Sequence, residues 1–176
     1  MHRYPSSIVI MGVAGCGKSS LGVAVAQQIG MSLIEGDDHH SQESLNKMRQ
    51  GIALDDADRD GWLAALSNIL QSQPAGLVLT CSALKRIYRD RLRLAAPGLL
   101  FVYLDINREQ ALARVTERAA SHFFSTSLVD SQFATLELPT GEAGVLRVDA
   151  TQPLAQLQSQ VCVWLANQNE TIKEQA

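Results

Sequence analysis

Short, mostly apolar runs alternate along the chain with longer segments that have helical periodicity. The apolar runs cover residues 7–11, 32–35, 77–81, 99–104 and 145–149. Most of them lack a polar–apolar alternation, which is typical of strands covered on both faces. The helical segments span residues 18–29, 56–71, 85–96, 108–119 and 153–168. Strands that alternate with helices predict an α/β fold: a parallel sheet with crossover helices on both faces, in three layers.

One globular domain over residues 1–176 fits the length of the chain, which is large enough to bury a substantial core. No repeat or low-complexity linker divides the sequence. The residues after Asn167 carry few apolar side chains. We expect this tail to fray.

The charge balance disfavours partners that need a basic surface. A formal charge of −3 and a pI near 5.8 argue against a nucleic-acid-binding face. No apolar run approaches the roughly 18 residues of a membrane span, and the N-terminus does not resemble a secretory signal. The three cysteines, Cys16, Cys81 and Cys162, are widely spaced and favour reduced thiols over a disulfide or zinc framework. We therefore expect a cytoplasmic protein with small-molecule partners, and with neither nucleic acid nor membrane among them.

The segment GVAGCGKS, residues 12–19, matches the phosphate-loop pattern G-x-x-x-x-G-K-[ST] between an apolar strand and a helix. Glycines allow the backbone N–H groups to converge on phosphate oxygens, and the helix N-terminus adds a positive dipole end. Lys18 is expected to reach the β- and γ-phosphates, and Ser19 to ligate Mg²⁺. A chance glycine-rich turn is the alternative. The predicted phosphate-binding residues are Gly12, Val13, Ala14, Gly15, Cys16, Gly17, Lys18, Ser19 and Ser20.

The size of the chain favours a kinase of small molecules among the proteins that carry a phosphate loop. Such an enzyme needs ATP, Mg²⁺, a carboxylate near the acceptor hydroxyl, and cations that neutralise charge in the transition state. A nucleotide-binding switch or regulatory module, which hydrolyses ATP slowly, is the alternative from another class. A kinase for another sugar acid or polyol is a closer alternative.

The segment IEGDDHH, residues 34–40, begins where the second predicted strand ends. Ligands of parallel sheets bind beyond the carboxyl ends of the strands, so Asp37 is expected near the phosphate loop. A carboxylate there can accept or orient the proton of an acceptor hydroxyl and can hold Mg²⁺ through water. A transition-metal site and a plain hydrophilic loop are the alternatives. We interpret Asp37 as the general base or orienting carboxylate, and as a metal ligand together with Ser19.

Five cations lie within the nine residues 85–93, after the third predicted strand. Lys85 and Arg89 share a helix face and lie near the strand end, where they can meet an anionic substrate. A solvated basic face is the alternative, and we prefer it for Arg91 and Arg93.

The polar and aromatic segment 118–137 follows the fourth predicted crossover helix. It is typical of a lid that excludes water and brings Arg118 onto the phosphates. An ordinary helical hairpin packed by Phe123, Phe124 and Phe133 is the alternative.

Together these motifs resemble the gluconate kinase (gluconokinase) family, small P-loop enzymes related to shikimate and adenylate kinases. The resemblance covers nearly the whole chain and is carried by MGVAGCGKS, EGDDHH, GIALDDADRDGWL, CSALKRIYRDRLR and SHFFSTSLVDSQFATLE. It implies transfer of the ATP γ-phosphoryl to the 6-hydroxyl of D-gluconate, a homodimer, and a five-stranded sheet of order 2-3-1-4-5. It also implies an acceptor-binding segment over about residues 37–60 and a lid over about residues 119–138.

The resemblance also implies which residues contact each substrate. The adenine is expected against the segment 149–153, near Arg114 or Arg118, with Thr151 and Pro153 as contacts. The chain departs from the family pattern at Glu35, where an Asp is usual, at Ser41 and Gly61, where Pro is usual, and in the spacing before His122, which leaves the lid arginine open. The expected gluconate contacts are Asp37, His40, Lys47, Arg49, Arg59, Lys85, Arg89 and His122.

Replacing Lys18 tests the phosphate loop. Lys18→Ala is expected to weaken nucleotide affinity and to slow turnover, because the ammonium is the charge placed on the transferred phosphate. Nucleotide titration together with steady-state kinetics measures both effects. Unchanged kinetics would remove the loop from the mechanism.

Overall fold

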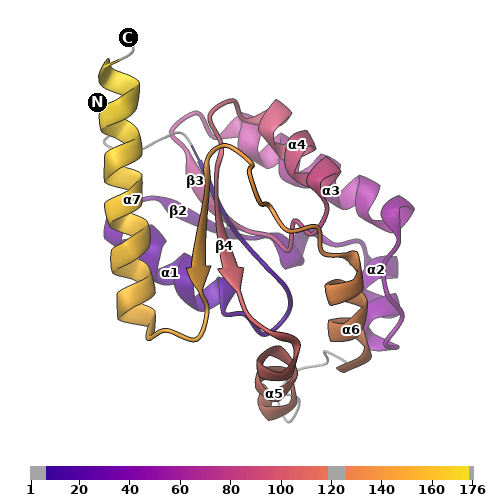
Figure 1. Cartoon of the computed structure of the whole chain (residues 1–176). Coiled ribbons are helices and arrows are strands. Elements are labelled where there is room, and N and C mark those ends of the chain that lie inside the picture. Colours follow the sequence, from indigo (N-terminus) through magenta and orange to yellow (C-terminus); the bar gives the residue numbers. More distant parts are fainter. Residues whose placement is uncertain (1–6, 119–125, 175–176) are drawn as a thin grey trace.

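Five parallel strands form the centre of the molecule (Figure 1). The computed structural model describes residues 7–118 and 126–174, with side chains as far as residue 168. The sheet has the order β2-β3-β1-β4-β5, which confirms both the α/β class and the expected order. The strands are β1 (Ile8–Met11), β2 (Ser32–Glu35), β3 (Leu77–Thr80), β4 (Leu100–Asp105) and β5 (Val145–Asp149).

Helices connect the strands. Four of them match predicted helices to within one residue at each end, and a fifth, α7, begins one residue after its predicted start but ends six residues beyond its predicted end. The 3₁₀ helix η1 and the helices α2 and α6 were not predicted. The expected fraying after Asn167 was wrong for the backbone, because α7 continues to Glu174. The helices are α1 (Lys18–Ile29), η1 (Gly36–His39), α2 (Gln42–Arg49), α3 (Asp56–Ser72), α4 (Arg86–Ala95), α5 (Arg108–Arg118), α6 (Thr126–Thr135) and α7 (Leu154–Glu174).

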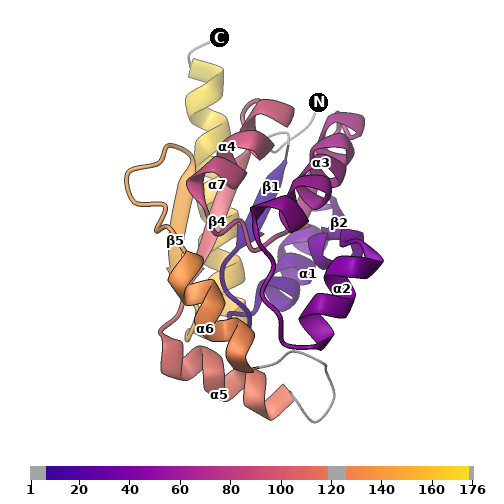
Figure 2. The same ribbon diagram turned by 90° about the vertical axis from the view of Figure 1, so that its right-hand side faces the viewer.

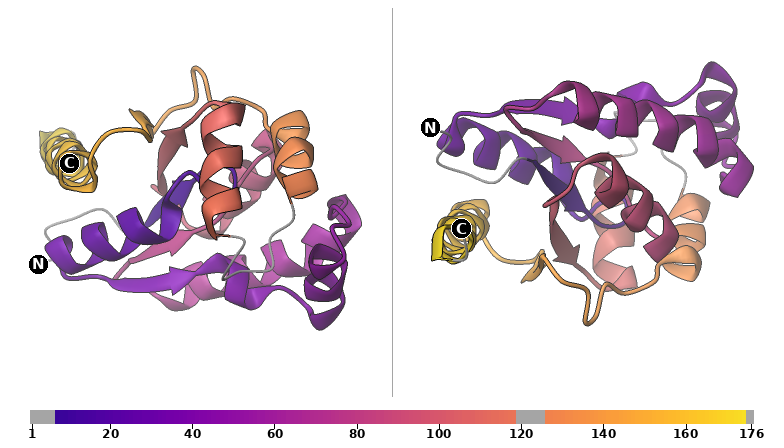
Figure 3. Two further views of the ribbon diagram at one scale, coloured as in Figure 1. Left: turned by 90° about the horizontal axis from the view of Figure 1, so that it is seen from below. Right: turned by 90° about the horizontal axis from the view of Figure 1, so that it is seen from above.

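Alternate residues of each central strand supply two separate cores. Ile8 and Ile10 pack with α1, α5 and α7 on one face of the sheet. Val9 and Met11 pack with α3 and α4 on the other face. Figure 3 looks along α7, which lies beside α1 at the edge of the molecule. Because both faces are covered, the central strands β1 and β3 are fully buried and nearly all apolar, as the sequence pattern indicated, whereas the edge strands β2 and β5 carry charged residues and are partly exposed.

Local capping determines where α3 begins. The side chain of Asp55 accepts from the Asp58 N–H at 2.9 Å, and the Asp58 side chain accepts from the Asp55 N–H at 3.0 Å. This reciprocal pair is a capping box, which satisfies N–H groups that have no partner within the helix. Trp62 and Leu66, further along α3, are buried against the sheet. The start of α3, which carries Arg59, is therefore held at both its cap and its core face.

A buried ion pair ties α4 to the loop before β5. The guanidinium of Arg89 is fully buried, donates to both carboxylate oxygens of Glu142, and also donates to the carbonyls of Ala83 and Leu84. This geometry corrects the expectation that Arg89 faces the substrate, since all of these bonds hold it inside the fold. Arg93, for which we preferred a solvated face, donates to Glu142 at 2.8 Å.

The pKa of Glu142 reflects this environment. Burial by itself raises the pKa, but hydrogen bonds from Arg89 and Arg93 outweigh it, so the pKa lies below its ordinary value. A lowered pKa means that the ionised form stabilises the folded state above the unfolded pKa of about 4.3. That contribution is lost as the pH falls through the folded value.

Among the described helices, none combines the length and the apolar surface that crossing a membrane requires.

Glu142→Gln is expected to lower the free energy of unfolding by about 3 kcal/mol at pH 7, because it leaves a buried guanidinium without its counter-charge. The difference from the wild type should shrink as the pH falls below about 4. Asp60→Asn is the matched control, since Asp60 pairs with Arg91 at the surface and such pairs contribute little. Urea unfolding at several pH values measures these effects. Equal losses in both variants would contradict the role of burial.

Candidate active site

The phosphate loop connects β1 to α1 and lies at the carboxyl ends of the strands, as predicted. Gly15 has φ +80°, in the left-handed region, and a Cβ there would lie 2.8 Å from the Ala111 carbonyl oxygen. Only glycine fits this turn without strain. The Lys18 ammonium donates to the carbonyls of Gly12 and Val13, each at 3.1 Å. The lysine is therefore held over the loop whose N–H groups would receive phosphate.

Cys16 is buried inside the same loop, with 1% of its surface exposed. Burial raises the pKa of its thiol, and the nearby Lys18 only partly opposes this effect. Its side chain therefore belongs to the core, and only its backbone is placed to bind phosphate. Ser20 lies in the first turn of α1 and is exposed.

A carboxylate that sequence reasoning did not assign joins the loop to the neighbouring strands. Glu35, the last residue of β2, accepts from the Ser19 hydroxyl at 3.0 Å and from the Thr80 hydroxyl through the same oxygen. Thr80 in turn accepts from the Gly36 N–H at 3.3 Å. The available signal was the acidic residue two positions before Asp37 at a strand end.

The 3₁₀ helix η1 places Asp37 beside the phosphate loop. Its side chain is 76% exposed, and its Oδ1 lies 3.8 Å from Nε2 of His40. His40 is 6% exposed and stacks on Trp62, with ring centroids 4.4 Å apart. The Trp62 indole N–H donates to the Gly36 carbonyl at 2.7 Å. Trp62 thus fixes both ends of the short helix that carries Asp37.

The surroundings of His40 favour the neutral form of its imidazole by lowering the pKa of the ring. Burial lowers its pKa, and the nearby Arg59 lowers it further, whereas Asp37 acts in the opposite direction. Below neutral pH the ring therefore resists protonation more than a free histidine does. His40 therefore lies beside the Asp37 carboxylate as a hydrogen-bonding group whose neutral form is favoured.

Arg59 is the buried cation of the site. Its surface is only 8% exposed, and its guanidinium carbon lies 5.7 Å from the centroid of the Tyr88 ring. The ion pairs of the described residues include none to Arg59. A buried guanidinium without a counter-charge is costly, so an anionic ligand would stabilise it.

A cavity of about 210 Å³ brings these groups together. Figure 2 shows α6 on one side of this end of the molecule and α2 on the other. The cavity is lined by the phosphate loop, η1, the start of α3, α5 and α6. The polar and charged lining residues include Lys18, Ser19, Asp37, His40, Arg59, Arg118 and Gln132.

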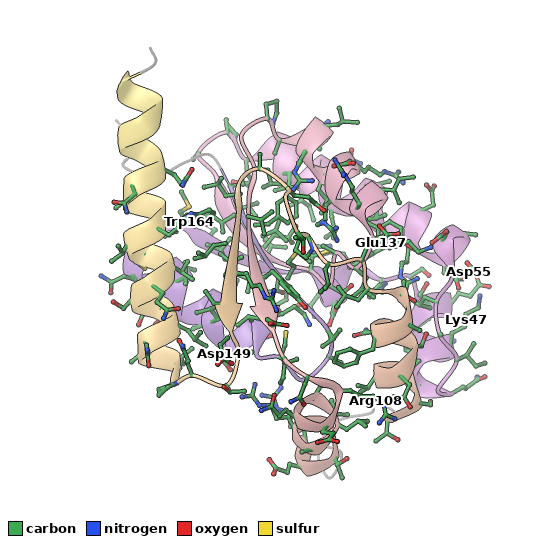
Figure 4. All side chains as sticks on the ribbon, in the orientation of Figure 1. Lys47, Asp55, Arg108, Glu137, Asp149 and Trp164 are labelled. Carbon is green, nitrogen blue, oxygen red and sulfur yellow. The ribbon has the colours of Figure 1, made fainter. Side chains whose placement is uncertain are left out.

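Other predicted substrate cations lie outside the described cavity lining. Lys47 pairs with Asp58 at 2.6 Å, and Lys85 pairs with Asp56 at 2.8 Å. Arg49 is exposed at the end of α2. Figure 4 shows Lys47 and Asp55 on α2 and at the start of α3, away from α5. Carboxylates of the acidic segment 55–60 therefore neutralise two of these cations, which corrects the expectation that all of them face the substrate.

The residues outside the phosphate loop that were predicted to bind nucleotide are Arg114, Thr151 and Pro153. Arg114 donates to the Ala150 carbonyl at 2.8 Å and to the carbonyls of Gly15 and Cys16 at 3.4 Å. Thr151 donates through its N–H and hydroxyl to Asp149, and these bonds lower the pKa of that carboxylate. Arg114 thus joins the loop to the turn that contains Thr151 and precedes Pro153. The predicted contact His122 lies outside the described residues.

The residues of this site fit a bound Mg²⁺. The Ser19 hydroxyl and the Glu35 carboxylate are oxygen donors within 3.0 Å of each other, and Asp37 lines the same cavity. Magnesium takes few protein oxygens and completes its shell with water and phosphate oxygens.

The sheet order, the phosphate loop and the cavity beside it define a small P-loop kinase. In agreement, residues 14–133 match the shikimate kinase family. A probable gluconokinase of Schizosaccharomyces pombe is 42% identical over 148 residues, which cover 79% of this chain and 76% of that protein. The thermosensitive gluconokinase of Escherichia coli K12 is 38% identical over 159 residues, covering 88% and 84% respectively.

The crystal structure of a gluconokinase from Sinorhizobium meliloti 1021 superimposes with a TM-score of 0.91 at 45% identity, over 99% of each chain. The chain belongs to the gluconokinase family, as the resemblance of its motifs indicated.

Gly36→Ala tests the attachment of η1. A Cβ at Gly36 would lie 2.2 Å from the Thr80 carbonyl oxygen, so the backbone must move and carry Asp37 with it. We expect a loss of about 1–3 kcal/mol in the free energy of unfolding, together with slower turnover. Gly61→Ala is the control, because Gly61 lies within α3 and has no atom within 4 Å of its added Cβ. That change should be neutral or stabilising; similar losses in both variants would contradict the role of Gly36.

Proposed function

We propose that this protein transfers the γ-phosphoryl group of ATP to the 6-hydroxyl of D-gluconate and releases 6-phosphogluconate and ADP. The observation that carries this proposal is the single cavity in which the phosphate loop, the exposed carboxylate of Asp37 and the buried cation Arg59 meet. Gluconokinase relatives that match most of the chain support the choice of acceptor.

The phosphate side of the reaction relies on fixed donors. The N–H groups of residues 15–19 and the N-terminus of α1 would hold the triphosphate, and the Lys18 ammonium would bind the γ-phosphate. Ser19, with Glu35 and Asp37, would hold Mg²⁺, which neutralises phosphate charge when it is bound. Arg118, at the cavity wall, is our candidate for a second cation on the phosphates.

The acceptor side relies on Asp37. In the proposed step its carboxylate accepts the proton of the 6-hydroxyl as the O6–P bond forms, and the bond between the γ-phosphorus and the bridging oxygen breaks, so that ADP leaves with the electron pair. The exposure of Asp37 to the cavity supports this role. The neutral imidazole of His40, 3.8 Å away, can orient an acceptor hydroxyl without adding charge.

Recognition of the gluconate carboxylate is assigned to Arg59. A guanidinium binds a carboxylate through two parallel N–H···O bonds, which gives both charge and geometry. The anion would also supply the counter-charge that Arg59 lacks among the described ion pairs. His122 remains a predicted contact.

The remaining features of the proposed enzyme follow the family. We propose an acceptor-binding segment over about residues 37–60, a lid over about residues 119–138, and a homodimer. Ile87 and Leu94, two turns apart on α4, are 70% and 85% exposed, and they offer an apolar face for a second copy. Three free cysteines fit a reducing compartment and support a cytoplasmic location.

Asp37→Asn is expected to lower turnover about a hundredfold or more, the scale of a positioned general base, and to leave ATP affinity nearly unchanged. Asp38→Asn is the matched control, because Asp38 is exposed and outside the described cavity lining. Coupled ADP release and nucleotide titration measure the two effects. Wild-type turnover in Asp37→Asn would make the carboxylate a bystander.

The same ADP-release measurement tests the acceptor. The wild type should respond to gluconate far more than to shikimate, nucleoside monophosphates or a neutral polyol such as sorbitol. Faster ADP release with another sugar acid or polyol would identify that compound as the acceptor in place of gluconate. ADP release that depends on no acceptor would favour a nucleotide switch.

A further inference from the structure

One side chain of α6 reaches the phosphate loop. The Ala14 N–H donates to Oε1 of Gln132 at 2.7 Å, across 118 positions of sequence. A backbone N–H can only donate, so the atom that it meets must be the amide oxygen, and this fixes the orientation of the Gln132 amide. The two N–H donors on Nε2 therefore lie on the side of the amide away from this bond.

Gln132 belongs to the cavity of the proposed reaction. Gln132 lines that cavity together with Lys18 and Asp37. Among the hydrogen bonds of the described residues, none uses Nε2 of Gln132. A primary amide whose oxygen is bound, and whose nitrogen has no hydrogen-bond partner among the described residues, can donate to an anionic oxygen.

Contacts on both sides hold the helix that carries Gln132. Arg108 of α5 forms two hydrogen bonds with Asp130, at 2.6 and 3.0 Å. Just beyond α6, Glu137 accepts from the Arg86 N–H at 2.7 Å and donates its own N–H to the Leu84 carbonyl at 2.9 Å. Figure 4 labels Arg108 and Glu137, on either side of α6. The amide of Gln132 is thus held in place before any ligand binds.

We propose that Gln132 is a catalytic hydrogen-bond donor to the transferring phosphoryl group. Its Oε1 remains bound to the Ala14 N–H, and Nε2 donates to an oxygen of the γ-phosphoryl as negative charge spreads over those oxygens in the transition state. Gln132 neither gains nor loses a proton in this step. The inference rests on the proposed phosphoryl transfer and adds a neutral donor to Lys18 and Arg118.

Two substitutions separate donation from tethering. Gln132→Glu keeps an oxygen for the Ala14 N–H but removes both donors and adds negative charge beside the phosphates. Gln132→Met keeps the length of the side chain and removes both functions. We expect each variant to lower kcat by about a hundredfold, the cost of losing one donor to developing charge, with the KM for ATP and the affinity for ADP changed less than threefold.

Gln158→Met is the matched control. Gln158 also forms a side-chain bond to a distant backbone group, the Ala24 carbonyl at 2.8 Å, but it joins α7 to α1. Turnover close to that of the wild type is expected. Thermal unfolding of all three variants checks that they are folded.

A transition-state mimic gives a readout that does not need the acceptor to be gluconate. ADP with tetrafluoroaluminate resembles the transferring phosphoryl group, and both Gln132 variants should bind it far more weakly than the wild type while they bind ADP normally. Wild-type kcat in Gln132→Glu would show that the residue is only a tether. Tighter ATP binding by Gln132→Met with unchanged kcat would show that the amide only blocks a phosphate position. Either result overturns the proposal. A failure of the proposed function would be seen in a different measurement, because the wild type would then release ADP at a rate that does not depend on gluconate.

Discussion

The hydrogen bonds around the Glu35 carboxylate join the two halves of the candidate site. One oxygen of this group accepts from Ser19, at the start of α1, and from Thr80, at the end of β3. Thr80 accepts from Gly36, and the Gly36 carbonyl accepts from Trp62. A continuous chain of hydrogen bonds therefore connects the phosphate loop to the backbone that carries Asp37. Phosphoryl transfer depends on such positioning, because the protein contributes little covalent chemistry of its own.

The distribution of charge explains how one anion site arises in an acidic segment. Three cations that were predicted to bind substrate have carboxylate partners: Lys47 pairs with Asp58, Lys85 with Asp56, and Arg89 with the buried Glu142. Arg59 is buried without such a pair among the described residues. A ligand carboxylate can relieve that cost, so the fold favours an acidic acceptor over a neutral one.

The local pattern of apolar and polar residues predicted most of the strands and helices. The short, mostly apolar runs located all five strands, and the pattern was clearest for the central strands, which are covered on both faces. The order of the strands came from the family resemblance, since periodicity contains no information about neighbours. Helix α2 has few apolar residues and was missed, and α6 was hidden in a segment interpreted as a lid.

The site was predictable where its residues are local in sequence and much less so where they pair over long distances. The phosphate loop and Asp37 follow strand ends, so topology alone placed them together. Arg89 was misassigned because its partner Glu142 lies 53 positions away in an irregular loop. Gln132 was overlooked because its bond to Ala14 spans 118 positions. Glu35 was noticed only as a longer replacement for a usual aspartate, although it anchors the site.

The central claim is that Asp37 holds the acceptor hydroxyl in line with the γ-phosphate. A crystal structure with a non-hydrolysable ATP analogue, Mg²⁺ and gluconate measures this most directly. We expect the 6-hydroxyl oxygen within about 2.6–3.2 Å of the Asp37 carboxylate and opposite the bridging oxygen of the γ-phosphorus. A 6-hydroxyl many ångströms from Asp37 in the closed complex would contradict it.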